Sequence, residues 1–200
     1  MRIIAGKYRG RLLQAVPGDS TRPTTDRTRE AWASTIGSLL PHGFEGLRVL
    51  DVFAGSGALG IEALSRGADS AVFCENGQRA LTVLKKNLSI VEDPTKAVLV
   101  LAVDVFSLKA LRLLKEAGPY QLVLLDPPYS TPRKKVESLL YTLVEAKSIR
   151  PGALVSYEHK NNREQDLGGS VLRTNGSQAG LSLVSCKNYG NTQIEYLCYQ

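Results

Sequence analysis

The stretch that decides the fold is DVFAGSGALG, residues 51–60, which follows the apolar run LRVL at residues 47–50. A short apolar run bounded by turn residues predicts a buried strand. Gly55, Gly57 and Gly60 then give the spacing G-x-G-x-x-G, which permits a sharp turn from strand to helix and a close approach of a ligand to the backbone. The stretch therefore predicts the first βα unit of an α/β fold that binds a nucleotide-like ligand.

The rest of the chain alternates short apolar runs with segments of helical periodicity, a pattern that predicts a largely parallel sheet. The last two apolar runs flank Tyr189-Gly190-Asn191 and predict an antiparallel pair, so we expect a mixed sheet. The predicted strands are 47–53, 70–75, 97–104, 120–126, 152–159 and a pair within 181–200, and the predicted helices are 26–40, 58–67, 78–91, 106–117 and 133–147, with a hairpin around residues 6–10.

Asp51 indicates which ligand the glycine turn suits. It stands at the carboxyl end of the first predicted strand, four positions before Gly55. A dinucleotide would place its pyrophosphate at this turn, where an uncompensated carboxylate repels it. S-adenosylmethionine brings a cationic amino acid to the same place, so the charge of Asp51 favours this sulfonium cofactor.

Glu75 and Asp104 end the next two predicted strands. Ligands of open α/β sheets bind outside the carboxyl ends of the strands, so both acids are well placed for the same cofactor. We expect Glu75 to accept hydrogen bonds from both ribose hydroxyls, and Asp104 to accept one from the adenine amine, with Val105 packing on the ring. Either acid taken singly is also typical of a loop start or a helix N-cap.

The fourth predicted strand ends in Asp126-Pro127-Pro128-Tyr129. The two prolines lack backbone donors and stiffen the segment, which leaves the carbonyl of Pro127 as a fixed acceptor. The Asp126 carboxylate and this carbonyl can each take one hydrogen of an amino group on a planar base, while Tyr129 stacks on the base. The motif therefore predicts methylation of an exocyclic amine; a plain turn that ends a strand is the alternative.

Composition limits the class of protein. The 200 residues, 43% of them hydrophobic, suit one domain with a well-filled core. The three widely spaced cysteines predict neither a disulfide framework nor a zinc site, and we expect no metal. No apolar run approaches the roughly 18 residues of a membrane span. We expect a soluble, cytoplasmic protein that does not act at a membrane.

The net charge of +6 is concentrated at the N-terminus. Residues 1–30 contain seven basic and three acidic side chains, a net charge of +4, whereas the other 170 residues carry only +2. Such a concentration is typical of an arm that contacts phosphates. A solvated basic face without a partner would have the same composition.

With these motifs the chain resembles a known family, the RsmD-type 16S ribosomal RNA guanine-N2 methyltransferases, which are class I S-adenosylmethionine-dependent enzymes. The similarity covers nearly the whole chain. The glycine turn and DPPY alone would indicate only an enzyme that methylates an amine, and two segments near the N-terminus indicate this family in particular. The matching segments are MRIIAGKYRGRLL (1–13), RPTTDRTREA (22–31), VLDVFAGSGALGIEALSRGA (49–68), DPPY (126–129), PGALVSYEH (151–159) and YGNTQIEYL (189–197).

The resemblance implies a class I methyltransferase fold: a seven-stranded mixed sheet with helices on both faces and a small basic N-terminal extension. It implies one domain, residues 1–200, divided into an RNA-contacting extension (1–45) and a catalytic core (46–200). The substrate would be 16S ribosomal RNA, which we expect to be presented within a small-subunit assembly particle. The implied cofactor-binding residues are Asp51, Phe53, Ala54, Gly55, Ser56, Gly57, Glu75, Asn76, Asp104 and Val105; those for the target guanine are Asp126, Pro127, Pro128 and Tyr129; and those for RNA are Lys7, Arg9, Arg11, Arg22, Thr24 and Arg27.

Three alternatives stay open from the sequence. A DNA adenine-N6 methyltransferase can use the same DPPY geometry, although it ordinarily needs a target-recognition region that this chain does not show. An NAD-binding oxidoreductase could use the glycine turn, but it leaves Asp51 and the DPPY motif unexplained. A non-catalytic RNA-binding module is disfavoured by the acids at four successive strand ends.

Overall fold

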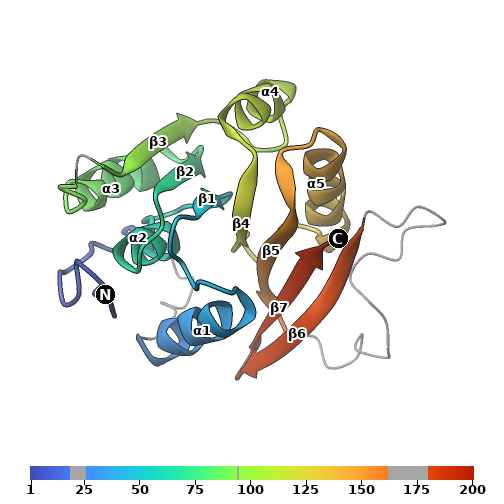
Figure 1. The fold of residues 1–200 in the computed structure, drawn as a ribbon. Helices are drawn as coiled ribbons and strands as arrows, with labels where there is room; N and C mark the ends of the chain where they lie inside the picture. Colours follow the sequence, from blue (N-terminus) through green and yellow to red (C-terminus); the bar gives the residue numbers. More distant parts are fainter. Residues whose placement is uncertain (19–25, 94, 162–179) are drawn as a thin grey trace.

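The computed structural model describes residues 1–18, 26–93, 95–161 and 180–200. Helices and strands alternate through most of it, as the sequence predicts (Figure 1). The helices are α1 (Asp26–Leu39), α2 (Ala58–Ser65), α3 (Gln78–Leu88), α4 (Leu108–Ala117) and α5 (Arg133–Glu145), and the strands are β1 (Arg48–Asp51), β2 (Ser70–Glu75), β3 (Ala97–Ala102), β4 (Tyr120–Leu125), β5 (Ile149–Lys160), β6 (Leu181–Tyr189) and β7 (Thr192–Tyr199).

The strands form one seven-stranded mixed sheet in the order β3-β2-β1-β4-β5-β7-β6. The first five strands are parallel, and β7 pairs antiparallel with both β5 and β6. The predicted fold class, with its terminal antiparallel pair, is confirmed. The order of the parallel strands reverses between β1 and β4, and open α/β sheets bind ligands at such a switch point.

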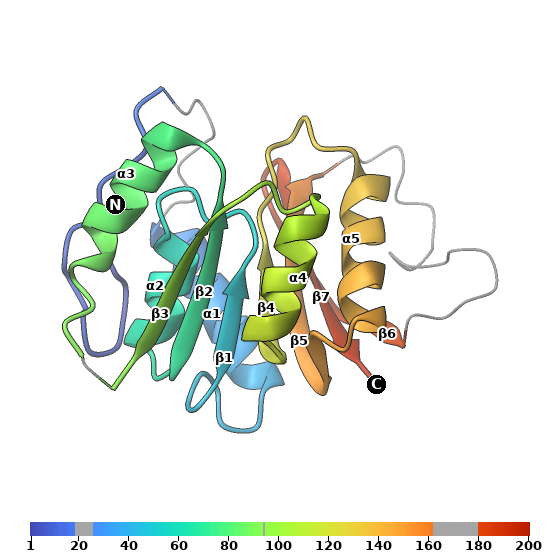
Figure 2. The same ribbon diagram turned by 90° about the horizontal axis from the view of Figure 1, so that it is seen from above.

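Helices cover both faces of the sheet, which explains why the central strands are apolar on both sides (Figures 1 and 2). On one face, α1, α2 and α3 enclose a core that includes Trp32, Ile61 and Leu84. On the other face, α4 and α5 enclose a second core with Leu114 and Leu140. The sheet is therefore held rigidly between two layers, and its strand ends are fixed relative to one another.

The fifth strand differs from its predicted span of 152–159, because β5 begins at Ile149. Ile149 pairs with Tyr120, and the register then shifts so that Leu154 pairs with Leu122. The irregularity accommodates Pro151 and Gly152, residues that ordinarily mark a strand boundary. Beyond it the register is regular and places Tyr157 beside Leu125.

The N-terminal segment forms the predicted hairpin, with an antiparallel bridge between Arg2 and Leu12. It is attached to α2 through the carboxylate of Glu62, which accepts hydrogen bonds from the backbone nitrogens of Ile4 and Ala5 at 2.8 and 3.1 Å. Glu62 is buried, and its charge is balanced by Arg66 at 2.7 Å. The N-terminal hairpin, which forms the basic arm, thus lies on the same side of the sheet as α2 and α3 (Figure 1).

Within the described residues, no helix is both long enough and apolar enough to cross a membrane.

Candidate active site

A cavity of about 530 Å³ opens at the carboxyl ends of the central strands. Its volume is in the range of about 300–1,000 Å³ that is usual for small-molecule sites. Most of the predicted site residues line it, although they are spread over almost 80 positions of the chain. The predicted residues that line it are Asp51, Phe53, Ala54, Gly55, Ser56, Glu75, Asn76, Asp104, Val105, Asp126, Pro127, Pro128 and Tyr129.

Asp51 is buried at the end of β1, where its Oδ2 accepts a hydrogen bond of 3.1 Å from the backbone nitrogen of Gly60. Burial, together with the smaller effect of the charges of Asp126 and Glu75, raises the pKa of Asp51 to about 7, and this hydrogen bond opposes the shift. Such a carboxyl is costly without a cationic partner. The position therefore suits a ligand that brings positive charge.

Glu75 holds the glycine turn from the end of β2. Its Oε2 accepts a hydrogen bond of 2.8 Å from the nitrogen of Gly55, and its Oε1 accepts from the nitrogens of Asn76 and Gly77 at 2.9 and 2.7 Å. These backbone donors fix the carboxylate at the edge of the cavity. One of its roughly four lone-pair sites, on Oε2, then remains for the hydroxyls of a ligand.

Gly57 differs from the other predicted cofactor residues because it does not line the cavity. It lies beneath the turn with φ near +80°, and a Cβ there would overlap the side chain of Leu84. Gly57 therefore shapes the turn through its backbone and its lack of a side chain.

An apolar slot lies beside Asp104 at the end of β3. Val105 is buried there, and the rings of Phe53 and Phe106 lie 5.9 Å apart in a tilted arrangement. One carboxylate oxygen of Asp104, Oδ1, accepts a hydrogen bond of 3.0 Å from the nitrogen of Phe106. This slot has the flat apolar walls and the single acceptor that an aromatic base with an amino group requires.

The DPPY segment forms the opposite wall of the cavity. Tyr129 is half exposed, and its hydroxyl lies 3.1 Å from that of Thr192 on β7. This contact ties the ring to the sheet while it stays accessible to a partner. Pro127, Pro128 and Tyr129 also border a second, smaller cavity of about 270 Å³.

Glu158 of β5 lines the main cavity and was missed by the sequence analysis. The β4–β5 register pairs Leu125 with Tyr157, and its continuation brings Glu158 beside Asp126. Burial raises the pKa of Glu158 to about 8, with a further contribution from the charge of Asp126. An acid that interrupts the apolar run of a predicted central strand was the signal available in the sequence.

Arg29 of α1 is a second residue that the sequence analysis missed. It lines the cavity and is only 1% exposed. Its place three and seven residues before Trp32 and Ile36 put a charged side chain on the apolar face of the helix. That conflict with the pattern was the signal that could have identified it.

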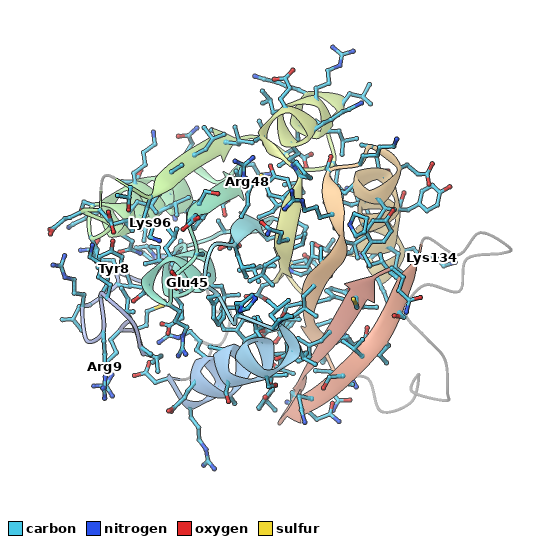
Figure 3. All side chains as sticks on the ribbon, in the orientation of Figure 1. Tyr8, Arg9, Glu45, Arg48, Lys96 and Lys134 are labelled. Carbon is cyan, nitrogen blue, oxygen red and sulfur yellow. The ribbon has the colours of Figure 1, made fainter. Side chains whose placement is uncertain are left out.

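The predicted RNA-binding residues that the structure describes, Lys7, Arg9, Arg11 and Arg27, do not line the cavity. Arg22 and Thr24 are outside the described residues. Lys7 and Arg11 are exposed but form ion pairs with Asp93 and Glu92 at 2.7 and 3.2 Å. The two remaining residues, Arg9 and Arg27, are also exposed, and Arg9 extends outward from the tip of the hairpin (Figure 3).

Comparison with known proteins identifies the family. A family model described as "Conserved hypothetical protein 95" matches residues 1–197. A Bacillus subtilis (strain 168) protein named "Putative rRNA methyltransferase YlbH" is 38% identical over 188 residues, which are 92% of this chain and 97% of that protein. The chain belongs to the RsmD-type methyltransferase family.

Two further comparisons agree with this assignment. The Haemophilus influenzae protein named "Ribosomal RNA small subunit methyltransferase D" is 34% identical to the RsmD-type chain over 163 residues, 82% of this chain and 80% of that protein. A solved Escherichia coli structure titled "Putative methyltransferase yhhF" is 31% identical with a TM-score of 0.76, and the match covers 100% of this chain and 98% of the other. The protein is thus a methyltransferase of this family.

The cavity of this RsmD-type methyltransferase fits S-adenosylmethionine in three respects. Buried Asp51 suits a cation, the fixed carboxylate of Glu75 suits a diol, and the slot around Val105 suits a flat base with an amine. Among the residues that the structure describes, no group of His, Cys, Asp or Glu side chains could hold a metal ion.

Proposed function

We propose that this methyltransferase transfers a methyl group from S-adenosylmethionine to the exocyclic N2 amine of a guanine in 16S ribosomal RNA. The observation that carries the proposal is the presence of Asp126 and the DPPY segment in the same cavity as Asp51 and Glu75. One half of the cavity suits the cofactor, and the other half suits an amino group. The names of the B. subtilis and H. influenzae relatives support ribosomal RNA as the substrate.

The cofactor half would use the ends of β1, β2 and β3. Asp51 would face the positively charged amino acid portion, and Glu75 would accept hydrogen bonds from the ribose hydroxyls. Asp104 would accept one from the adenine amine, with Val105 against the ring. The bound cofactor supplies an activated methyl group on a sulfonium, so the residues of the chain need only bind and align the partners.

The substrate half would hold the amine. The carboxylate of Asp126 and the carbonyl of Pro127 each accept one hydrogen from the nitrogen, which directs its lone pair toward the methyl donor. Tyr129 offers a half-exposed ring on which the base can stack. Asp126 would also stabilise the positive charge that develops on the nitrogen.

Glu158 favours guanine over adenine in this arrangement. The Watson–Crick edge of guanine presents two adjacent donors, N1–H and the N2 amine, whereas adenine presents an acceptor at N1. Asp126 and Glu158 are neighbouring carboxyl groups that can accept both donors. A neutral Glu158 keeps a carbonyl oxygen for N1–H and can donate its proton toward Asp126.

The basic arm would contact the RNA backbone. Lys7, Arg9 and Arg11 are exposed on the hairpin, and Arg27 is exposed on α1. We propose residues 1–45 as the RNA-contacting extension of a catalytic core at 46–200. The arm is small for reading sequence, so a partly assembled small subunit would present the guanine. This substrate implies a cytoplasmic enzyme.

The experiment that tests the proposal supplies radiolabelled S-adenosylmethionine with unmodified 16S ribosomal RNA, with partly assembled small subunits and with duplex DNA. We expect label in one or both ribosomal substrates, recovered as N2-methylguanosine after digestion to nucleosides. Label in DNA alone, or recovery as N6-methyladenosine, would overturn the proposal. Tighter binding of NAD than of S-adenosylmethionine would favour the oxidoreductase.

A further inference from the structure

Arg29 is a buried arginine whose hydrogen bonds are incomplete. Its side chain is 2% exposed, and Nη2 donates to the carbonyl of Arg2 at 2.8 Å and to Oδ1 of Asp26 at 2.6 Å. The buried Nε has no hydrogen-bond partner among the residues that the structure describes. Buried polar groups are nearly always paired, so an incompletely paired guanidinium in a residue that lines a cavity points to a ligand.

The position of Arg29 places this donor near the glycine turn. Arg2, whose carbonyl it contacts, follows Met1, and the Sδ atom of Met1 lies 3.9 Å from the hydroxyl of Ser56 in the turn. Met1, Arg29 and Ser56 all line the main cavity. Arg29 therefore lines the cavity together with a residue of the turn and with the N-terminal residue beside it.

The charges that line the cavity make Arg29 distinctive. Asp51, Glu75, Asp104, Asp126 and Glu158 are acidic, whereas Arg29 is the one Lys, Arg or His side chain among the described lining residues. S-adenosylmethionine carries a carboxylate on its amino acid portion as well as its two cationic groups. An anion in so acidic a cavity requires a compensating cation.

We propose that Arg29 binds the carboxylate of the amino acid portion of the cofactor. The proposal rests on the placement of the cofactor in this cavity, as described under the proposed function. A guanidinium hydrogen bond to a carboxylate is charge-assisted, and burial strengthens it. The existing bonds to Arg2 and Asp26 fix the plane of the guanidinium. Arg29 is thereby a cofactor-binding residue contributed by the N-terminal extension.

The test compares two ligands that differ only in this carboxylate: S-adenosylhomocysteine and its decarboxylated analogue, S-adenosyl-3-thiopropylamine. Calorimetry of the full-length wild-type protein should show tighter binding of S-adenosylhomocysteine by about 10- to 100-fold, the effect of one charge-assisted hydrogen bond or two. Arg29→Met should lose most of this preference and bind the decarboxylated analogue with nearly unchanged affinity. The control Arg112→Met, on exposed α4, should keep the full preference.

Other results of this experiment would overturn either the role of Arg29 or the placement of the cofactor. Full preference in Arg29→Met, or an equal loss of affinity for both ligands, would overturn the role of Arg29. If Arg29→Met does not fold, Arg29→Lys carries the test. It keeps the charge but not the planar guanidinium, so its preference should fall below the wild-type value, and an unchanged preference overturns the proposal. Failure of the wild type to bind either ligand would refute the cofactor placement itself.

Discussion

The side-chain amide of Asn87 donates a hydrogen bond of 2.8 Å to the carbonyl oxygen of Ser56 in the glycine turn. The same amide group exchanges two hydrogen bonds with the backbone of Gln14, at 2.8 and 3.0 Å. Asn87 is buried at the end of α3. One side chain therefore fixes the segment that follows the hairpin to the turn that shapes the cofactor site.

Replacement of Asn87 by Leu should destabilise the protein and weaken cofactor binding together. The substitution leaves three backbone groups without partners, and we expect a loss of about 2–4 kcal/mol in the free energy of unfolding. Urea denaturation and calorimetry with S-adenosylhomocysteine would measure the two effects. The control is Lys85→Ala on the exposed face of α3. If Asn87→Leu had the same stability and cofactor affinity as this control, Asn87 would not fix the two segments to each other.

Gly60→Ala should displace Asp51. A Cβ at this position would overlap the ring of Phe73 and lie 3.0 Å from Oδ2 of Asp51. Overpacking of this kind costs about 1–3 kcal/mol, and we expect weaker cofactor binding as well. Gly37→Ala is the matched control because its Cβ would meet open space on helix α1, where alanine should stabilise by about 0.5–1 kcal/mol. Equal stability changes in the two variants would refute the packing argument.

Asp126→Ala should separate catalysis from cofactor binding. If Asp126 holds the target amine, turnover should fall by about 100-fold or more, as when one group that stabilises the transition state is removed. The affinity for S-adenosylhomocysteine should change only a few-fold. Asp51→Ala provides the contrast, because it should lose cofactor binding itself. A loss of affinity in Asp126→Ala as large as that in Asp51→Ala would show that Asp126 belongs to the cofactor half.

Glu158 should make stability depend on pH. Burial raises its pKa from 4.5 to about 8, so between these values the folded protein keeps a proton that the unfolded chain has released. Stability therefore falls as the pH rises from about 5 to 8. Glu158→Gln removes this contribution, so the stability of the variant relative to wild type should increase across the window and level off above it.

Urea denaturation at several pH values would measure this difference, with Glu145→Gln at the exposed end of α5 as the control. A constant difference between wild type and Glu158→Gln across the whole range would contradict the raised pKa. If the stability of Glu145→Gln relative to wild type changed with pH in the same way, the effect would come from the loss of any negative charge and not from the buried Glu158.

Arg9→Ala should weaken RNA binding through the loss of a phosphate contact. Arg9 has no ion-pair partner among the described residues, whereas Lys7 and Arg11 are paired with acidic side chains. We expect the slope of log K against log salt to fall by about one unit. Filter binding of ribosomal RNA at several salt concentrations would measure it, and Lys115→Ala on α4 should leave the slope unchanged. An unchanged slope in Arg9→Ala would indicate a solvated surface residue.

The sequence predicts the sheet and the acids at its strand ends because both depend on local patterns. Apolar runs mark the strands, and the carboxyl ends of parallel strands meet at one edge, so Asp51, Glu75, Asp104 and Asp126 could be placed together without coordinates. The spacing of the glycines does not show that a Cβ at Gly57 would overlap the side chain of Leu84, because that contact depends on how α3 packs.

Arg29 and Glu158 could not be assigned because their roles depend on tertiary contacts. Arg29 reaches the cavity only because α1 packs across the sheet, far in sequence from the glycine turn. Glu158 reaches Asp126 only through the register of β5, which shifts between its start and Leu154. A polar residue within an apolar pattern marked each one, but nothing local identified its partner.

The strand order has a consequence for how enzymes of this architecture can diverge. The groups suited to the nucleoside come from β1, β2 and β3, whereas Asp126, Tyr129 and Glu158 come from the opposite side of the switch point. Substitutions that alter which base is modified can therefore accumulate on one side while the other stays intact. A laboratory effort to retarget the enzyme should accordingly vary β4, β5 and the segment between β4 and α5, and leave the first three strands untouched.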